Sequence, residues 1–154
     1  MHGRQIQRAK LNDRIAFHLA AVAHTITVAD GVVADVIGFR STCSAVIEVK
    51  VSRSDFMADA KKPERRKYGA GLGVYRFYLC PEGIIGPEEV PARWGLLHAI
   101  ERAVKEVVAP TGNMWPPIGA AVDGWANFQH AANPDTERAV LFSIARRLAA
   151  GQPI

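Results

Sequence analysis

The chain has 154 residues, 49% of them hydrophobic and 22% charged, which excludes a disordered or fibrous protein and predicts one domain over residues 1–154. Its formal charge of +4 and pI of about 9.3 are compatible with nucleic-acid binding without requiring it. The polar N-terminus is no signal peptide, and no apolar run approaches the roughly 18 residues of a membrane span. Because there are only two cysteines, with no disulfide or zinc-site spacing, we expect a reduced, cytoplasmic protein.

The first part of the chain predicts one helix and a hairpin. A helix is expected over residues 10–24, where apolar side chains recur at spacings of three and four. The β-branched residues 25–28 predict a short strand, and a second strand is expected over residues 32–39. Asp30 and Gly31 between them are a turn signal, so we predict that the two strands form a hairpin.

Residues 45–52 form a β-branched run of strand length with two charges in its middle. Side chains alternate between faces in a strand, so Glu48 and Lys50 share one face and their apolar neighbours the other. A charged pair inside such a run is costly to bury unless a metal ion or a phosphate balances it. A surface ion pair between Glu48 and Lys50 is the alternative interpretation of the pattern.

The expected hairpin register brings a second carboxylate to this pair. If the polar turn is centred between Ser41 and Thr42, the residue numbers of antiparallel partners sum to about 83, which pairs Asp35 with Glu48. The Cβ atoms of such partners lie roughly 5 Å apart. Two carboxylates that close repel each other, and a divalent cation between them removes the repulsion.

The residues of this face fit metal-dependent hydrolysis of a phosphodiester. Mg²⁺ (or Mn²⁺) takes one or two carboxylates and keeps several waters, so Asp35 and Glu48 are the predicted ligands, with the backbone carbonyl of Val49 as a third. Lys50 is predicted to orient the attacking water or to stabilise charge on the phosphate. The predicted catalytic residues are therefore Asp35, Glu48 and Lys50.

A capped helix and a basic segment follow this strand. Ser52 and Asp55 form a capping-box pattern, which predicts a short helix that ends near Pro63. Residues 61–68 carry five cations and one carboxylate, which fits either a solvated helix face or phosphate contacts. Next to a candidate nuclease strand we favour phosphate contacts, and the predicted DNA-binding residues are Arg53, Lys61, Lys62, Arg65, Arg66 and Lys67.

Strand formers dominate the middle of the chain. Residues 74–80 predict a buried strand, and the helical connection makes it parallel to the strand over residues 45–52, with a right-handed crossover. Residues 94–100 predict another strand, whereas residues 104–108 fit a strand or a helix equally well.

An irregular Trp-, Pro- and Gly-rich segment at about residues 110–132 predicts a lid or an insertion. Trp115 and Trp125 are expected to pack against the domain, and stacking on an unpaired base is the alternative. Asn133 and Pro134 then predict the start of a C-terminal helix over about residues 134–150. Its predicted core face consists of Ala139, Phe142, Ile144, Ala145 and Leu148, with Arg138, Arg146 and Arg147 facing solvent.

Three segments carry a recognisable pattern, namely residues 33–37, residues 46–61 with the string E-V-K-x-S-x-x-D-F-x-x-D-x-K, and residues 74–78. These segments resemble the MmcB-like DNA-repair proteins of the PD-(D/E)XK nuclease superfamily. Residues 94–97 and 137–148 are similar in kind. The resemblance therefore covers about residues 12–108 and the last helix.

The resemblance implies an α/β fold of the mixed α+β kind, with a restriction-endonuclease-like core whose central mixed β-sheet runs in αβββαβ order and is flanked by helices. It also implies Mg²⁺-dependent DNA hydrolysis in DNA repair, catalysed by Asp35, Glu48 and Lys50. Many members carry a metal-assisting Glu on the first helix, for which this chain offers only Asp13 and Gln5 or Gln7.

Two other classes of function stay open. A nuclease-fold protein that binds DNA and assists repair with little or no activity would share this fold, although it would not need paired carboxylates that face a phosphate. A protein-interaction module that uses the Trp-rich segment is the third option. DNA is the expected partner, a membrane is not, and a homodimer is left open.

Overall fold

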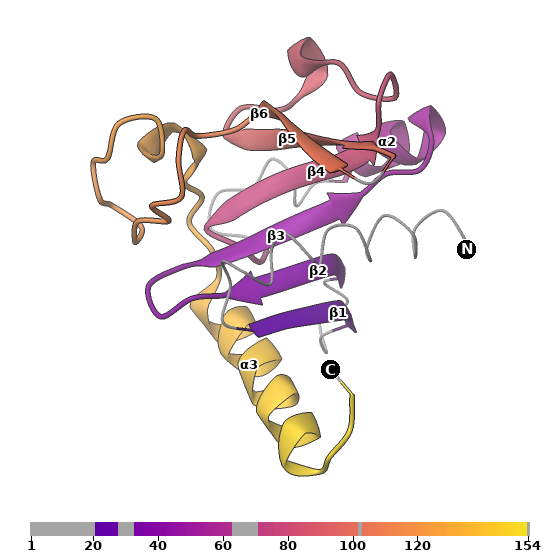
Figure 1. The fold of residues 1–154 in the computed structure, drawn as a ribbon. Coiled ribbons are helices and arrows are strands. Elements are labelled where there is room, and N and C mark those ends of the chain that lie inside the picture. The colour runs from indigo at the N-terminus through magenta and orange to yellow at the C-terminus, as the bar shows by residue number, and fades with distance from the viewer. Residues whose placement is uncertain (1–20, 28–32, 63–70, 102, 154) are drawn as a thin grey trace.

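The computed structural model of the chain describes residues 21–27, 33–62, 71–101 and 103–153. Within these ranges the chain forms a six-stranded mixed sheet, two α-helices and two short 3₁₀ helices (Figure 1). The fold is therefore of the mixed α+β kind, as predicted. None of the helices in these ranges is long and apolar enough to cross a membrane.

The sheet begins with two antiparallel connections. β1 (Ala21–Thr27) pairs with β2 (Val33–Phe39), as the hairpin prediction requires, and β2 pairs with β3 (Ser44–Val49). The predicted helix over residues 10–24 is wrong for its last four residues, because their backbone pairs with β2 from Val36 to Phe39. Pairing with a neighbouring strand stabilises the extended conformation of these residues more than the helical spacing of their apolar side chains stabilises a helix. The rest of that helix and the predicted Asp30–Gly31 turn lie outside the described residues.

The middle of the sheet is parallel. β3 ends at Val49, before the predicted residue 52, because Ser52 is already the N-cap of α2 (Arg53–Ala60) and accepts a hydrogen bond from the Asp55 N–H at 3.2 Å. β4 (Tyr75–Pro81) then runs parallel to β3, as predicted.

The remaining strands extend the sheet in chain order. β5 (Trp94–Ile100) is parallel to β4, and β6 (Ala103–Val108) is antiparallel to β5, so the segment that fitted a strand or a helix is a strand. The short helices η2 (Pro87–Glu89) and η3 (Ala126–Phe128) lie in the connections after β4 and β6.

The two faces of the sheet are covered by different parts of the chain. One face carries Val46, Tyr78 and Trp94, and it packs against buried residues of α2 and α3 (Pro134–Ala149). The opposite face carries Ile47, Tyr75 and Phe77, and it buries the irregular segment that follows β6. Even-numbered residues of β3, β4 and β5 therefore lie on one face and odd-numbered residues on the other, because successive side chains of a strand point to opposite faces.

The tryptophans of the irregular segment pack inward, as predicted. Trp125 is 2% exposed, and its indole N–H donates to the carbonyl of Thr111 at 3.0 Å. Trp115 packs edge-on against Tyr75, with ring centroids 5.5 Å apart, and the Tyr75 hydroxyl donates to the carbonyl of Pro116 at 2.6 Å. Because Tyr75 is the first residue of β4, this segment lies at the opposite end of β3 and β4 from α2 (Figure 1).

The start of α3 follows the prediction. The side chain of Asn133 accepts hydrogen bonds from the N–H groups of Asp135 and Thr136 at 3.0 and 3.1 Å. Beyond the end of the helix, Gly151 has a φ of 65°, which favours glycine because it lacks a Cβ atom. Arg138, Arg146 and Arg147 are exposed, as predicted.

The predicted core face of α3 is wrong except for Ile144. Phe142 and Leu148 are 69% and 58% exposed, Ala139 and Ala145 are also exposed, and the buried residues are Thr136, Val140 and Ile144. Both sets have helical spacing, so the pattern alone does not choose between them.

A polar contact with the sheet determines which face of α3 is buried. Glu137 accepts hydrogen bonds from the Ser44 hydroxyl at 2.5 Å and from the Gly73 N–H at 3.0 Å. This anchor turns the stripe of Val140 and Ile144 toward Ile37, Phe39 and Val46 of the sheet.

Candidate active site

The register of β2 and β3 brings Asp35 beside Glu48. Val36 pairs with Ile47 and Phe39 with Ser44, so the residue numbers of partners sum to 83, as predicted. Pairing with β3 stops at Val36, although β2 starts at Val33. One position further, the Oδ2 atom of Asp35 accepts a hydrogen bond from the Val49 N–H at 3.0 Å.

The three predicted catalytic side chains are buried. Asp35 is 6% exposed, Glu48 4% and Lys50 3%. The Lys50 Nζ atom lies 3.6 Å from Oε2 of Glu48, so the ion pair between them exists, but the interpretation as a surface ion pair is wrong. Burying an amine and two carboxylates costs free energy that a solvated ion pair would not cost, so this arrangement calls for another explanation.

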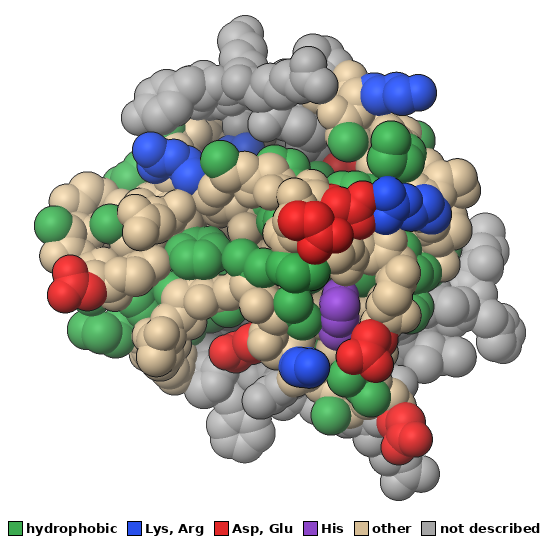
Figure 2. Space-filling model, turned by 90° about the horizontal axis from the view of Figure 1, so that it is seen from above, with side chains coloured by type: hydrophobic (Ala, Val, Ile, Leu, Met, Phe, Trp, Pro, Cys, Tyr) green, Lys and Arg blue, Asp and Glu red, His purple; other side chains and the backbone are tan. Residues whose placement is uncertain are grey.

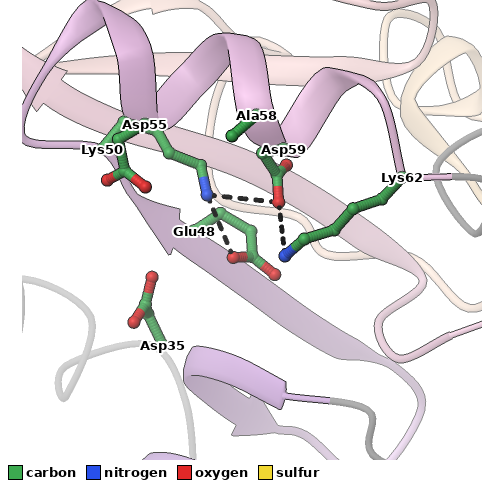
Figure 3. Close-up of a pocket in the computed structure, with 7 residues that line it drawn as sticks. All are labelled: Asp35, Glu48, Lys50, Asp55, Ala58, Asp59 and Lys62. Atoms are coloured by element: carbon green, nitrogen blue, oxygen red, sulfur yellow. Dashed lines mark ion pairs between the residues drawn. The ribbon is translucent and has the colours of Figure 1, made fainter.

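Helix α2 supplies the rest of the site. Asp59 is 2% exposed, and its Oδ1 atom lies 3.3 Å from the Lys50 Nζ atom and 3.1 Å from the Lys62 Nζ atom. Figure 3 shows the Lys50 amine in contact with the carboxylates of both Glu48 and Asp59, and the Lys62 amine in contact with Asp59. These side chains border an open cavity of about 140 Å³, which is lined by Asp35, Glu48, Lys50, Asp55, Ala58, Asp59 and Lys62.

Sequence reasoning did not assign Asp59 to the site. A usable signal was present, since Asp55 and Asp59 lie four residues apart on a helix that starts directly after the Lys50 strand. The helical spacing puts both carboxylates on one side of α2, and both line the cavity.

The charge of the cavity suits a divalent cation. Its described lining holds four carboxylates and two amines, which leaves a formal charge of −2. Within the described residues no three His, Cys, Asp or Glu side chains are grouped to hold a metal. A metal here would therefore rely on Asp35, Glu48, backbone oxygen and water, which is the ligand set that Mg²⁺ accepts.

The backbone carbonyl of Val49 is placed to join such a set. In a strand, the N–H and C=O of one residue point to the same side. The Val49 N–H points to Asp35, whereas the Lys50 N–H points away, to the carbonyl of Leu79 on β4 at 2.9 Å. The Val49 carbonyl therefore faces the side of Asp35, so the residues present fit the predicted metal.

Arg53, a predicted DNA-binding residue, is engaged elsewhere. Its guanidinium forms two hydrogen bonds with the Glu89 carboxylate, and it also donates to the carbonyl of Ile84 at 3.2 Å. The hydrogen bonds to Glu89 raise the pKa of Arg53 and lower that of Glu89. The structure therefore places Arg53 against η2 and not in the lining of the cavity.

The other predicted DNA-binding residues divide into two groups. Lys61 and Lys62 are exposed at the end of α2, and Lys62 lines the cavity. Arg65, Arg66 and Lys67 lie outside the described residues. On the face seen in Figure 2, the basic side chains of the described residues are scattered among acidic and apolar ones, so this face forms no uniform basic surface.

Comparisons with known proteins bear on the fold alone. No protein-family model matches the chain, and a search of curated proteins finds no match either. A solved structure, the SPO1766 protein of unknown function from Silicibacter pomeroyi, is similar with a TM-score of 0.59 and 23% sequence identity. The similarity covers 94% of this chain and 87% of that one.

Proposed function

We propose that this chain is a Mg²⁺-dependent (or Mn²⁺-dependent) deoxyribonuclease with a restriction-endonuclease-like core, of the MmcB-like kind, and that it acts in DNA repair. The observation that carries the proposal is the meeting of buried Asp35, Glu48 and Lys50 in one cavity where pairing between β2 and β3 stops. If this part of the sheet had only a structural role, two adjacent buried carboxylates would add nothing to the stability of the fold.

Each side chain has a distinct role in the proposed reaction. Asp35, Glu48 and the Val49 carbonyl would hold the metal, which, when bound, neutralises charge on the phosphate and lowers the pKa of a coordinated water. The Lys50 ammonium donates hydrogen bonds to the attacking water or to a phosphate oxygen, and so stabilises the negative charge that develops there. Lys61 and Lys62, with Arg65, Arg66 and Lys67, contact flanking phosphates.

A catalytically weak DNA-binding protein of the same fold is the second candidate. It is favoured by one observation, namely that the Lys50 amine already has two carboxylate partners, Glu48 and Asp59. An amine held in this way can be a structural element of the sheet. In that case the protein would bind DNA through its basic side chains and leave the phosphodiester intact.

Incubation of the purified chain with DNA separates the two candidates. Single-stranded, duplex and branched DNA are each incubated with Mg²⁺, Mn²⁺ or EDTA, and the products are resolved by gel. The nuclease proposal expects cleavage that depends on the metal and is lost in Glu48→Ala. Binding of DNA without cleavage of any substrate would establish the second candidate instead.

A further inference from the structure

We infer that Asp59 is a positioning residue, which holds the Lys50 ammonium where the reaction needs it, and that Tyr78 in turn holds Asp59. The role of Lys50 rests on the proposed function, whereas the contacts that position it do not. In this proposal both residues act through Lys50.

Asp59 makes the closer of the two carboxylate contacts to Lys50. The Nζ atom of Lys50 lies 3.3 Å from Oδ1 of Asp59 and 3.6 Å from Oε2 of Glu48. The same oxygen of Asp59 lies 3.1 Å from Nζ of Lys62. Its other oxygen accepts a hydrogen bond from the Tyr78 hydroxyl at 3.0 Å. Both oxygens of Asp59 are therefore engaged, and the carboxylate has one defined orientation.

Tyr78 is itself held rigidly. Its ring stacks on Trp94 with centroids 4.5 Å apart, and Phe56 packs edge-on against it at 5.3 Å. The residue is fully buried, and it pairs with Glu48 in the β3–β4 ladder. The Lys50 amine also lies 5.8 Å from the centroid of the Tyr78 ring, a cation–π distance. A ring held by Trp94 and Phe56 thus helps to set the position of both charged groups.

The charge balance explains why a second carboxylate is needed. A metal ion bound by Glu48 would draw that carboxylate's negative charge to itself. The buried Lys50 ammonium would then lose much of its compensation, which is costly at 3% exposure. Asp59 is a second counter-charge in contact with the amine (Figure 3), so the ammonium stays balanced in both states.

Two variants test this inference, and one variant is the matched control. Asp59→Asn removes the charge with little change in shape, and Tyr78→Phe removes only the hydroxyl that orients Asp59. Asp123→Asn makes the same chemical change at an exposed position of the irregular segment. The first readout is the NMR signal of the lysine side-chain ammonium groups in ¹⁵N-lysine-labelled protein, with Lys50→Gln to assign the signal of Lys50.

A buried, paired ammonium exchanges its protons slowly enough to give such a signal. We expect the Lys50 signal in the wild type and in Asp123→Asn, a shifted signal in Tyr78→Phe, and no signal in Asp59→Asn. An unchanged Lys50 signal in Asp59→Asn or in Tyr78→Phe would overturn the inference. Tyr78→Phe keeps every charge, so it decides the matter if Asp59→Asn does not fold.

The second readout is the kinetics of cleavage. Loss of a supporting contact of this kind costs about 10–100-fold in activity, so we expect Asp59→Asn to lower kcat by that factor with KM for DNA within about twofold. A rise in KM with kcat unchanged would contradict a positioning role. If the wild type cleaves no DNA, the proposed function fails, and the NMR signal still decides whether Asp59 positions Lys50.

Discussion

The Oδ2 atom of Asp35 accepts a hydrogen bond from the backbone N–H of Val49 at 3.0 Å. In a continued antiparallel ladder a backbone carbonyl of β2 would take this N–H, but pairing between β2 and β3 ends at Val36 and Ile47. The side chain of Asp35 satisfies the N–H instead. The end of the ladder therefore holds a carboxylate against β3, beside Glu48.

This hydrogen bond predicts different costs for two substitutions of Asp35. Asp35→Ala leaves the buried Val49 N–H without an acceptor and should lower the free energy of unfolding by about 1–3 kcal/mol. Asp35→Asn keeps an oxygen for that N–H, so it should cost clearly less. Urea unfolding of both variants measures the difference. Equal losses in the two variants would show that the hydrogen bond contributes nothing to stability.

Glu48→Gln should abolish most of the proposed nuclease activity while the fold persists. The substitution removes the charge that a metal ligand needs, and loss of an electrostatic group at the reacting centre costs about 10²–10³-fold in kcat. The measurement is the rate of DNA cleavage in Mg²⁺, with circular dichroism to check the fold. Glu82→Gln, at an exposed position, is the control. Undiminished cleavage by Glu48→Gln would remove Glu48 from the active site.

Lys62→Ala should weaken DNA binding and reduce its dependence on salt. Each phosphate contact that is lost lowers the slope of log K against log salt concentration by about 1. Binding is measured by fluorescence anisotropy at several salt concentrations, in EDTA to prevent cleavage. Arg146→Ala removes an exposed charge on α3 and should leave the slope unchanged. The same slope in Lys62→Ala and the wild type would refute a phosphate contact at Lys62.

Two aromatic residues should differ sharply in their effect on stability. Trp125 is 2% exposed and contacts the ring of Tyr75, so Trp125→Ala should cost about 3–5 kcal/mol. Phe142 is 69% exposed, and Phe142→Ala should change the free energy of unfolding by no more than about 0.5 kcal/mol. Chemical denaturation of both variants gives the comparison. A large loss in Phe142→Ala would mean that α3 is covered in solution.

His130 predicts how stability depends on pH. Burial, and then the charges of Arg76 and Arg93, lower the pKa of His130 from 6.5 to about 4. Above pH 6.5 the ring is neutral in both the folded and the unfolded chain, so its contribution is fully present. As pH falls from 6.5 to about 4, the unfolded chain takes up a proton that the folded chain does not, and stability declines.

The expected loss from His130 is up to about 2 kcal/mol, after allowance for the partial exposure of the ring. Urea unfolding between pH 7.5 and 4 measures it. His130→Gln keeps a donor for the Arg93 carbonyl, which the ring nitrogen of His130 contacts at 3.0 Å, but has no titrating group. The stability of this variant should therefore fall less steeply over the same pH range. Parallel curves would contradict the lowered pKa of His130.

Local patterns predicted most of the elements correctly. Ser52 and Asn133 cap helices as expected, because capping depends on a few neighbouring residues. The Asp35–Glu48 register also followed from the sequence, since a short turn sets which residues face each other. The end of the first predicted helix failed, because pairing with β2 extends β1 to Ala21 and no local pattern contains that partner.

The sequence by itself determined which residues alternate across β3, where its partner β2 turns back, and hence that Asp35, Glu48 and Lys50 share a face. Those relationships depend on a period of two and a short connection, both of which are local. Only the tertiary structure decided that Asp59 and Tyr78 enclose the Lys50 amine, and that α3 buries Val140 instead of Phe142. The physical reason is that a helix has several faces of similar spacing, and the elements packed against it determine which face is buried.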